Sequence, residues 1–197
     1  FDGLSVKYMS YESIFSAVLN IDPFTASVND FQSIAYAKKL LIPEDVDELT
    51  VSDWQNFLFT FCVEPYLKRY PCAVVYDYPI AISSMARVSA LDQEKAERFE
   101  IYLHGFECAN GYAEIEYVED YLKRCHVHNI YRKRKGLEEV QPDANFVHMI
   151  RDGFPACSGV SVGLDRVLLL LTESDAIGEV IARNVSGNSK SLKQVAA

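Results

Sequence analysis

The segment from Cys157 to Leu171 carries the side chains whose types and spacing point most directly to chemistry. Its pattern predicts a strand, a tight turn and the start of an apolar helix. Gly159, Ser161 and Gly163 share one strand face, because side chains alternate along a strand. That face carries almost no side-chain volume, so it leaves room for a ligand to lie against the backbone.

The other face of this strand holds Val160, Val162 and Leu164, which suit a hydrophobic core. Arg166 follows in the first turn of the predicted helix. A cation at that position opposes the helix dipole at a cost of about 0.3–1 kcal/mol. The placement therefore indicates a function, such as binding an anion.

A second informative segment runs from Gly105 to Glu114 and contains Asn110-Gly111. Asn-Gly between β-prone residues is the strongest short hairpin pattern, because both turn positions need φ > 0. A two-residue turn there places Glu107 directly opposite Glu114, with Cβ atoms ~4.5–5.5 Å apart. Like charges so close destabilise the pairing. Either the pair is exposed and screened, or a cation such as Mg²⁺ or a substrate ammonium lies beside it.

The composition is that of a soluble globular domain: 197 residues, 49% hydrophobic, with a mean hydropathy of −0.02. No apolar run approaches the ~20 residues of a membrane span, and the first residues lack a signal-peptide pattern. A cytoplasmic protein without a membrane partner is therefore expected. The net charge of −9 argues against a broad nucleic-acid-binding surface.

The cysteines are odd in number and scattered, which favours reduced thiols over a disulfide framework: Cys62, Cys72, Cys108, Cys125 and Cys157. The run from Cys125 to His128 lacks a second ligand pair, so its pattern favours a helix over a metal site. The basic run from Arg132 to Lys135 favours a solvated helix end over a docking patch for an acidic protein or RNA.

The elements around these segments predict an α+β fold with a largely antiparallel sheet. Helices are expected over 11–19, 29–41, 53–68, 116–135 and 144–151, with starts at Ser10, Asn29-Asp30 and Ser52-Asp53 and a break at Pro43. Strands are expected over 72–76 and 98–103, around the 105–114 hairpin, and in the segment described first. The tail after Ser186 is expected to be disordered.

Together these segments resemble the class II aminoacyl-tRNA synthetases, in particular their lysine branch. The run from Gly159 to Arg166 is similar to the third signature motif, a strand and helix joined through Gly-x-(Asp/Glu)-Arg. Phe99-Glu100, with the segment from Gly105 to Glu114, is similar to the lysine-branch pattern R-F-E … G-x-E-x-x-N-G-(F/Y)-x-E.

Within that branch the chain most resembles the family of elongation factor P–lysine ligases, from about residue 10 to 183. Three segments are similar to the ligase patterns F-T-F-x-V-E-P, A-E-R-F-E-V-Y and P-x-C-S-G-V: Phe59–Pro65, Ala96–Tyr102 and Pro155–Val160. The run from Glu179 to Ala182 is similar to the ligase ending, and the Phe-Pro…Arg ending of lysyl-tRNA synthetases is missing.

The resemblance implies a class II synthetase-like catalytic core, an antiparallel sheet flanked by helices, incomplete at the N-terminus. Residues 1–185 would be the C-terminal part of the catalytic domain, with a helical insertion at about 10–70, and 186–197 a flexible tail. The family's motif 2 carries an Arg-x-Glu that grips the α-phosphate. The one such triplet, Arg98-Phe99-Glu100, belongs to the later segment, so this chain is expected to be a fragment that is inactive alone.

The implied activity is ATP- and Mg²⁺-dependent formation of an aminoacyl-adenylate from lysine or (R)-β-lysine, followed by transfer to a lysine of elongation factor P. A homodimer is implied for the full-length protein. By the same resemblance ATP would be bound by Glu107, Cys108, Gly163 and Arg166, with Glu107 also binding Mg²⁺. The amino acid would be bound by Glu114, Asn110, Gly159 and Ser161.

Two alternatives stay open. A lysyl-tRNA synthetase fragment would use tRNA as acceptor, and an upstream anticodon-binding barrel in the gene would favour it. A non-catalytic synthetase-like binding module would lack the motif 2 Arg in the full-length protein, although Glu107, Glu114, Gly163 and Arg166 argue against it. Ser161 stands where the ligases often have Ala and the synthetases Gly, so the amino-acid preference is open.

Overall fold

A computed structural model describes residues 5–42, 46–83 and 85–181 of the chain, and it divides into two compact units, Phe1–Val162 and Gly163–Ala197. The first unit holds a five-stranded sheet of order β1-β2-β3-β4-β5. Only β1 and β2 run parallel, and every other neighbouring pair is antiparallel. The prediction of an α+β fold with a largely antiparallel sheet is confirmed.

The strands of this sheet are β1 (Val6–Ser10), β2 (Cys72–Pro79), β3 (Lys95–Leu103), β4 (Phe106–Ala113) and β5 (Ser158–Val162). The α-helices of the first unit are α1 (Tyr11–Leu19), α2 (Val28–Ala37), α3 (Val51–Leu58), α4 (Glu64–Leu67), α5 (Val118–Arg134) and α6 (Ala144–Arg151). The second unit holds α7 (Leu164–Leu171) and the short 3-10 helix η4 (Ile177–Glu179). The predicted break at Pro43 and the predicted tail lie outside the described residues.

Side-chain caps decide where the early helices begin. Ser10 caps α1 as predicted, with its hydroxyl accepting from the Ser13 N–H. In α2 the cap is Ser27, two residues before the predicted Asn29, because Ser27 and Asp30 form a reciprocal capping box. Thr50 and Asp53 form the same box at the start of α3. The predicted starts at 29–30 and 52–53 are wrong. Each helix begins directly after the residue whose hydroxyl pairs with the aspartate three positions later, which is Ser27 for α2 and Thr50 for α3.

The predicted helix over 53–68 is three segments instead of one. A π-helical stretch, Phe59–Val63, separates α3 from α4. Pro65 lies in the first turn of α4, and a proline has no N–H to continue an α-helical ladder. Insertions of this kind are the usual form of π-helix inside α-helices. Phe59 and Val63, at its two ends, both point into the core.

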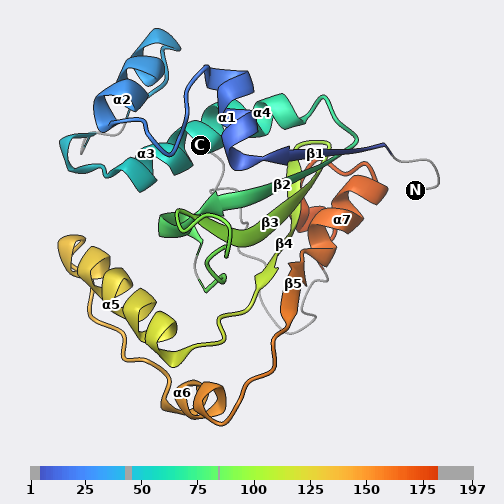
Figure 1. The fold of residues 1–197 in the computed structure, drawn as a ribbon. Coiled ribbons are helices and arrows are strands. Elements are labelled where there is room, and N and C mark those ends of the chain that lie inside the picture. Colours follow the sequence, from blue (N-terminus) through green and yellow to red (C-terminus); the bar gives the residue numbers. More distant parts are fainter. Residues whose placement is uncertain (1–4, 43–45, 84, 182–197) are drawn as a thin grey trace, which may run out of the picture. The chain divides into compact units, whose positions relative to one another are not determined.

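The main core lies between α1, α3, the π segment and one face of β2 and β3. Its largest members are aromatic, and the Tyr11 ring lies 4.6 Å from Phe15, 5.4 Å from Phe59 and 5.0 Å from Tyr78, measured between centroids. Figure 1 shows α1 to α4 gathered over the β1 and β2 side of the sheet. The β4 and β5 side of the same sheet face is not covered by these helices.

A second, smaller core forms where α5 and α6 meet, after β4. It is built from Ile115, Val118, Tyr121 and Ile150. The predicted strand, turn and helix at 157–171 are confirmed as β5 and α7. Val160 and Val162 are nevertheless 56% and 51% exposed. Neither residue belongs to the two cores formed by the described residues, so their predicted place in a core is wrong there.

The predicted turn at Asn110-Gly111 is also wrong, because both residues lie inside β4. The chain turns at His104-Gly105, where Leu103 pairs with Phe106 and both turn residues have positive φ, 49° and 84°. Two positive φ values in a two-residue loop are the pattern of a type I′ hairpin.

Gly111 is needed for a different reason from the one predicted. A Cβ at this position would lie 2.6 Å from the Phe99 ring and 2.8 Å from the Gly159 carbonyl oxygen. A glycine here therefore lets β3 and β5 approach β4 closely from both sides. No described helix has the length and apolar character needed to cross a membrane.

This packing gives a stability prediction. Gly111→Ala is expected to lower the free energy of unfolding by about 1–3 kcal/mol, because the added methyl group must displace the Phe99 ring or the β5 backbone. Urea unfolding followed by circular dichroism measures it. Gly178→Ala is the matched control, since a Cβ there meets nothing within 4 Å. Equal unfolding midpoints for the two variants would contradict the packing described.

Candidate functional site

A β-bulge brings Glu107 onto the sheet face that carries the other polar side chains of β4. Ile101 pairs with Ala109, but Tyr102 pairs with Glu107, which leaves Cys108 as the extra residue. A bulge changes the alternation of the strand. Glu107 consequently lies on the same face as Asn110, Tyr112 and Glu114, although strict alternation from Asn110 would place it on the opposite face.

The β5 residues of the same face complete the candidate site. Asn110 pairs with Ser161 and Tyr112 with Gly159, and paired residues of neighbouring strands share a face. The Glu114 carboxylate lies over Gly159, where an added Cβ would be 2.8 Å from Glu114 Oε1. The glycine thus gives the carboxylate its position. Gly159 and Ser161 share one face of β5, as predicted, and lie beside Asn110 and Glu114, whereas Gly163 lies beyond the end of β5.

The predicted carboxylate pair does not exist. Glu107 lies in β4 and Glu114 directly follows its last residue, so the two do not lie on opposite arms of a hairpin. Seven residues at the rise of a strand separate them by roughly 20 Å. No like-charge repulsion links them, so no cation is required between them. They mark opposite ends of one face instead.

A buried charged cluster borders the open part of this face. Glu100 of β3 is only 7% exposed, and its carboxylate accepts hydrogen bonds from Tyr78 Oη at 2.6 Å and from Tyr102 Oη. Arg98 Nη2 forms an ion pair with the same carboxylate. A buried carboxylate is tolerated when a cation and further donors saturate it. We call Tyr78, Arg98, Glu100 and Tyr102 the Glu100 cluster.

The two tyrosines of the Glu100 cluster stay protonated and act as donors. Burial is the largest cause that raises the pKa of Tyr78, and the pKa of Tyr102 is raised by burial first and by the Glu100 charge second. A hydroxyl that remains neutral can keep donating to the carboxylate. The cluster is therefore a fixed element of the sheet.

Sequence reasoning assigned no role to this cluster. Arg98, Glu100 and Tyr102 occur at every second position, so their common face was available from the sequence. The partner Tyr78 is 22 residues from Glu100 and belongs to β2. It comes into reach only through the β2–β3 register, which has a shift between Tyr76 and Tyr78.

Arg98 connects the cluster to a predicted site residue. Its Nε donates to Asn110 Oδ1 at 3.3 Å, and its Nη1 donates to the Ile82 carbonyl at 3.1 Å. Its guanidinium also lies over the Tyr78 ring, 4.4 Å from the centroid. The polar environment of Asn110 is thus set from β3.

The remaining predicted residues lie at two other places. Cys108 is the buried bulge residue next to Glu107. Gly163 directly precedes α7 and Arg166 lies in its first turn, as predicted, but both belong to the second unit. The site described here is therefore the one formed within the first unit.

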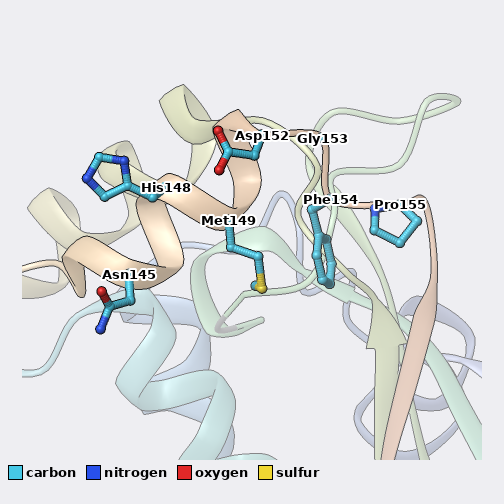
Figure 2. A pocket seen from close by; sticks show the side chains of 7 residues that line it. All are labelled: Asn145, His148, Met149, Asp152, Gly153, Phe154 and Pro155. Carbon is cyan, nitrogen blue, oxygen red and sulfur yellow. The ribbon is translucent and has the colours of Figure 1, made fainter.

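A surface hollow of the first unit lies elsewhere. Figure 2 shows it along α6 and the loop after it. Its volume is about 640 Å³. It is lined by Asn145, His148, Met149, Asp152, Gly153, Phe154 and Pro155. None of the predicted site residues contributes to it.

Comparison with known proteins gives a family match over most of the chain. Residues 9–183 match the family model for tRNA synthetases class II (D, K and N). The chain is 35% identical, over 181 residues, to the elongation factor P–(R)-β-lysine ligases of Yersinia pestis (strain Pestoides F) and Yersinia pseudotuberculosis serotype O:1b (strain IP 31758). These alignments cover 92% of this chain and 55% of each relative. The chain thus spans about half the length of these relatives.

The site geometry makes a prediction about ionisation. Burial, and next the negative charge of Glu114, raise the pKa of Tyr112 above its usual value. Glu114→Gln removes the charge that disfavours tyrosinate, so the pKa of Tyr112 is expected to fall while staying above that of a solvent-exposed tyrosine. Titration of the 13C-labelled tyrosine ring by NMR measures this shift.

Glu107→Gln is the control for this titration. Glu107 is separated from Tyr112 by more than the ~8–10 Å Debye length at ordinary salt, so the pKa of Tyr112 is expected not to change. An equal effect of both substitutions would show that Glu114 does not lie beside Tyr112.

Proposed function

The chain belongs to the class II tRNA synthetases (D, K and N), and on this premise we propose that it forms part of an ATP-dependent ligase. The ligase would activate lysine or (R)-β-lysine as the aminoacyl-adenylate and transfer it to a lysine of elongation factor P. The relatives named above are described as elongation factor P–(R)-β-lysine ligases. Because the chain covers 55% of their length, the activity is proposed for the whole protein.

The observation that carries the proposal is the open half of the sheet face. Glu114 lies over Gly159 next to Asn110 and Ser161. An ammonium group is bound by a carboxylate, and the missing side chain of Gly159 leaves room for the Glu114 carboxylate at this place. We assign Glu114 to an amino group of the substrate, and Asn110 and Ser161 to its polar backbone atoms.

The opposite end of β4 suits the nucleotide. Glu107 lies roughly 20 Å along the strand from Glu114, and an amino acid joined to a nucleotide is itself an extended molecule. We therefore assign Glu107 and Cys108 to ATP. The two ends of one strand would then hold the two ends of one adenylate.

The residues at this end fit Mg²⁺ that arrives with the nucleotide. Mg²⁺ is commonly held by one or two carboxylates together with substrate phosphates rather than by an all-protein cage. The described residues contain no group of three or more His, Cys, Asp or Glu side chains placed to hold a metal, and Glu107 supplies one half-buried carboxylate. When bound, the ion neutralises phosphate charge.

Two further assignments concern the second unit and the chain as a whole. Gly163 and Arg166 are proposed to serve ATP, with the Arg166 guanidinium meeting phosphate charge. Residues 1–185 are proposed to be part of the catalytic domain, with the helical segment at about 10–70 as an insertion. Elongation factor P is the proposed acceptor, and a homodimer is proposed for the full-length protein.

An activation assay tests this function. Full-length protein is incubated with ATP, labelled pyrophosphate and either L-lysine or (R)-β-lysine, and exchange is followed by transfer to elongation factor P or to tRNA. The proposal expects lysine-dependent exchange and transfer to elongation factor P. Transfer only to tRNA would identify a lysyl-tRNA synthetase, and no exchange with either lysine would overturn the assignment.

One substitution tests the substrate end of the face. Gly159→Ala is expected to raise the KM for the amino acid by roughly 10- to 100-fold, because its methyl group displaces the Glu114 carboxylate. The KM for ATP should change little, since Glu107 is remote.

Ser158→Ala is the matched control for that substitution. Ser158 pairs with Ala113 and points to the other sheet face, so its removal should leave both KM values unchanged. If Gly159→Ala behaved like Ser158→Ala, Glu114 would not be the group that binds the amino acid.

A further inference from the structure

Arg98 is the member of the Glu100 cluster that also contacts Asn110 on the open face of the sheet. Its side chain is only 12% exposed. One end of the guanidinium pairs with Glu100, while its Nε reaches Asn110 across the β3–β4 ladder. This arrangement gives a buried residue a direct influence on a proposed substrate-binding residue.

The guanidinium has little freedom to move. Glu100, the Ile82 carbonyl and the Tyr78 ring hold it from three directions. Glu100 is itself held by two tyrosine hydroxyls. The planar fork of an arginine matches such a set of acceptors with fixed geometry. The Nε–H consequently has one fixed direction, which is toward Asn110.

This contact determines which way the Asn110 amide points. A guanidinium carries only donors, so the atom of the amide that faces Arg98 must be the oxygen. The NH2 group then lies on the side away from Arg98. The described residues give this NH2 group no acceptor, and the Asn110 partner on β5 is Ser161, on the bare part of the face.

We propose that Arg98 is a positioning residue: it fixes the Asn110 amide with its NH2 group toward the ligand, where it donates to a carboxylate or carbonyl oxygen of the amino-acid substrate. The proposal deepens the proposed function and rests on it. Arg98 acts through Asn110 and does not touch the substrate. Glu100 and the Tyr78 ring keep Arg98 in place.

Arg98→Lys in the full-length protein tests the proposal. A lysine can keep the charge pair with Glu100, but its single ammonium cannot also supply the Nε–H to Asn110. The KM for the amino acid is expected to rise about tenfold, while the KM for ATP stays within about twofold. Asn110→Ala should raise the amino-acid KM at least as much.

The double variant separates positioning from a general structural role. If Arg98 acts through Asn110, adding Arg98→Lys to Asn110→Ala should raise the amino-acid KM no further, because coupled residues are non-additive. If the KM increases of the two single variants multiply in the double variant, Arg98 and Asn110 contribute independently to amino-acid binding. That result would overturn the proposal.

Arg87→Lys is the matched control. Arg87 is a partly buried arginine paired with Glu97 of β3 and with Glu116, without contact to Asn110. It should lower the thermal unfolding midpoint without changing the amino-acid KM. Equal KM changes for Arg87→Lys and Arg98→Lys would reduce the role of Arg98 to stability.

A spectroscopic arm distinguishes this proposal from the proposed function. The 15N side-chain amide signals of Asn110 should be sharp and dispersed in the unsubstituted protein, and should move toward averaged values in Arg98→Lys but not in Arg87→Lys. Unmoved signals in Arg98→Lys would overturn the positioning role even if lysine is activated. Absent lysine activation with moved signals would overturn the function and, with it, the amino acid as the ligand of Asn110.

Discussion

The register that joins β3, β4 and β5 is the constraint on which the candidate site depends. It places Glu100 opposite Asn110, and Asn110 opposite Ser161, so that three strands present their polar side chains on one face. A shift of one residue would turn every side chain of a strand to the other face. The two-residue turn at His104-Gly105 and the bulge at Cys108 set this register. Close packing around Gly111 holds the strands together.

One face of the sheet both lines the main core and carries the candidate site, because α1 to α4 cover only part of it. Under α1 and the π segment it contributes Ala73, Val75, Tyr78 and Tyr102 to an aromatic core. Toward β4 and β5 it carries Asn110, Tyr112 and Glu114 without that cover. The Glu100 cluster marks the boundary. Its burial carries a desolvation cost of several kcal/mol per ion, offset by an arginine and two hydroxyl donors, and the result is a rigid border for a ligand site.

Local patterns in the sequence predicted most of the helices and strands. Packing between distant segments determined the features that those patterns missed. Ser10, the amphipathic segments and the Gly-rich strand before Arg166 gave α1, α6, β5 and α7, because caps and periodicity act within a few residues. Asn110-Gly111 predicted a turn because the pattern is strong. In the structure Gly111 lies within a strand, where a side chain would collide with the Phe99 ring and the Gly159 carbonyl oxygen. His104-Gly105 carried the weaker pattern and forms the turn. The Tyr78–Glu100 bond joins residues from two strands, so no local pattern could show it.

Cross-strand nuclear Overhauser effects between backbone protons measure the β3–β4 register directly. In the 13C,15N-labelled chain we expect contacts that link Glu100 with Asn110 and Ile101 with Ala109, and a turn at 104–105. Contacts that link Ala109 with Tyr112 across a turn at 110–111 would contradict it. In that case Asn110 would leave Arg98, and the shared polar face would not exist.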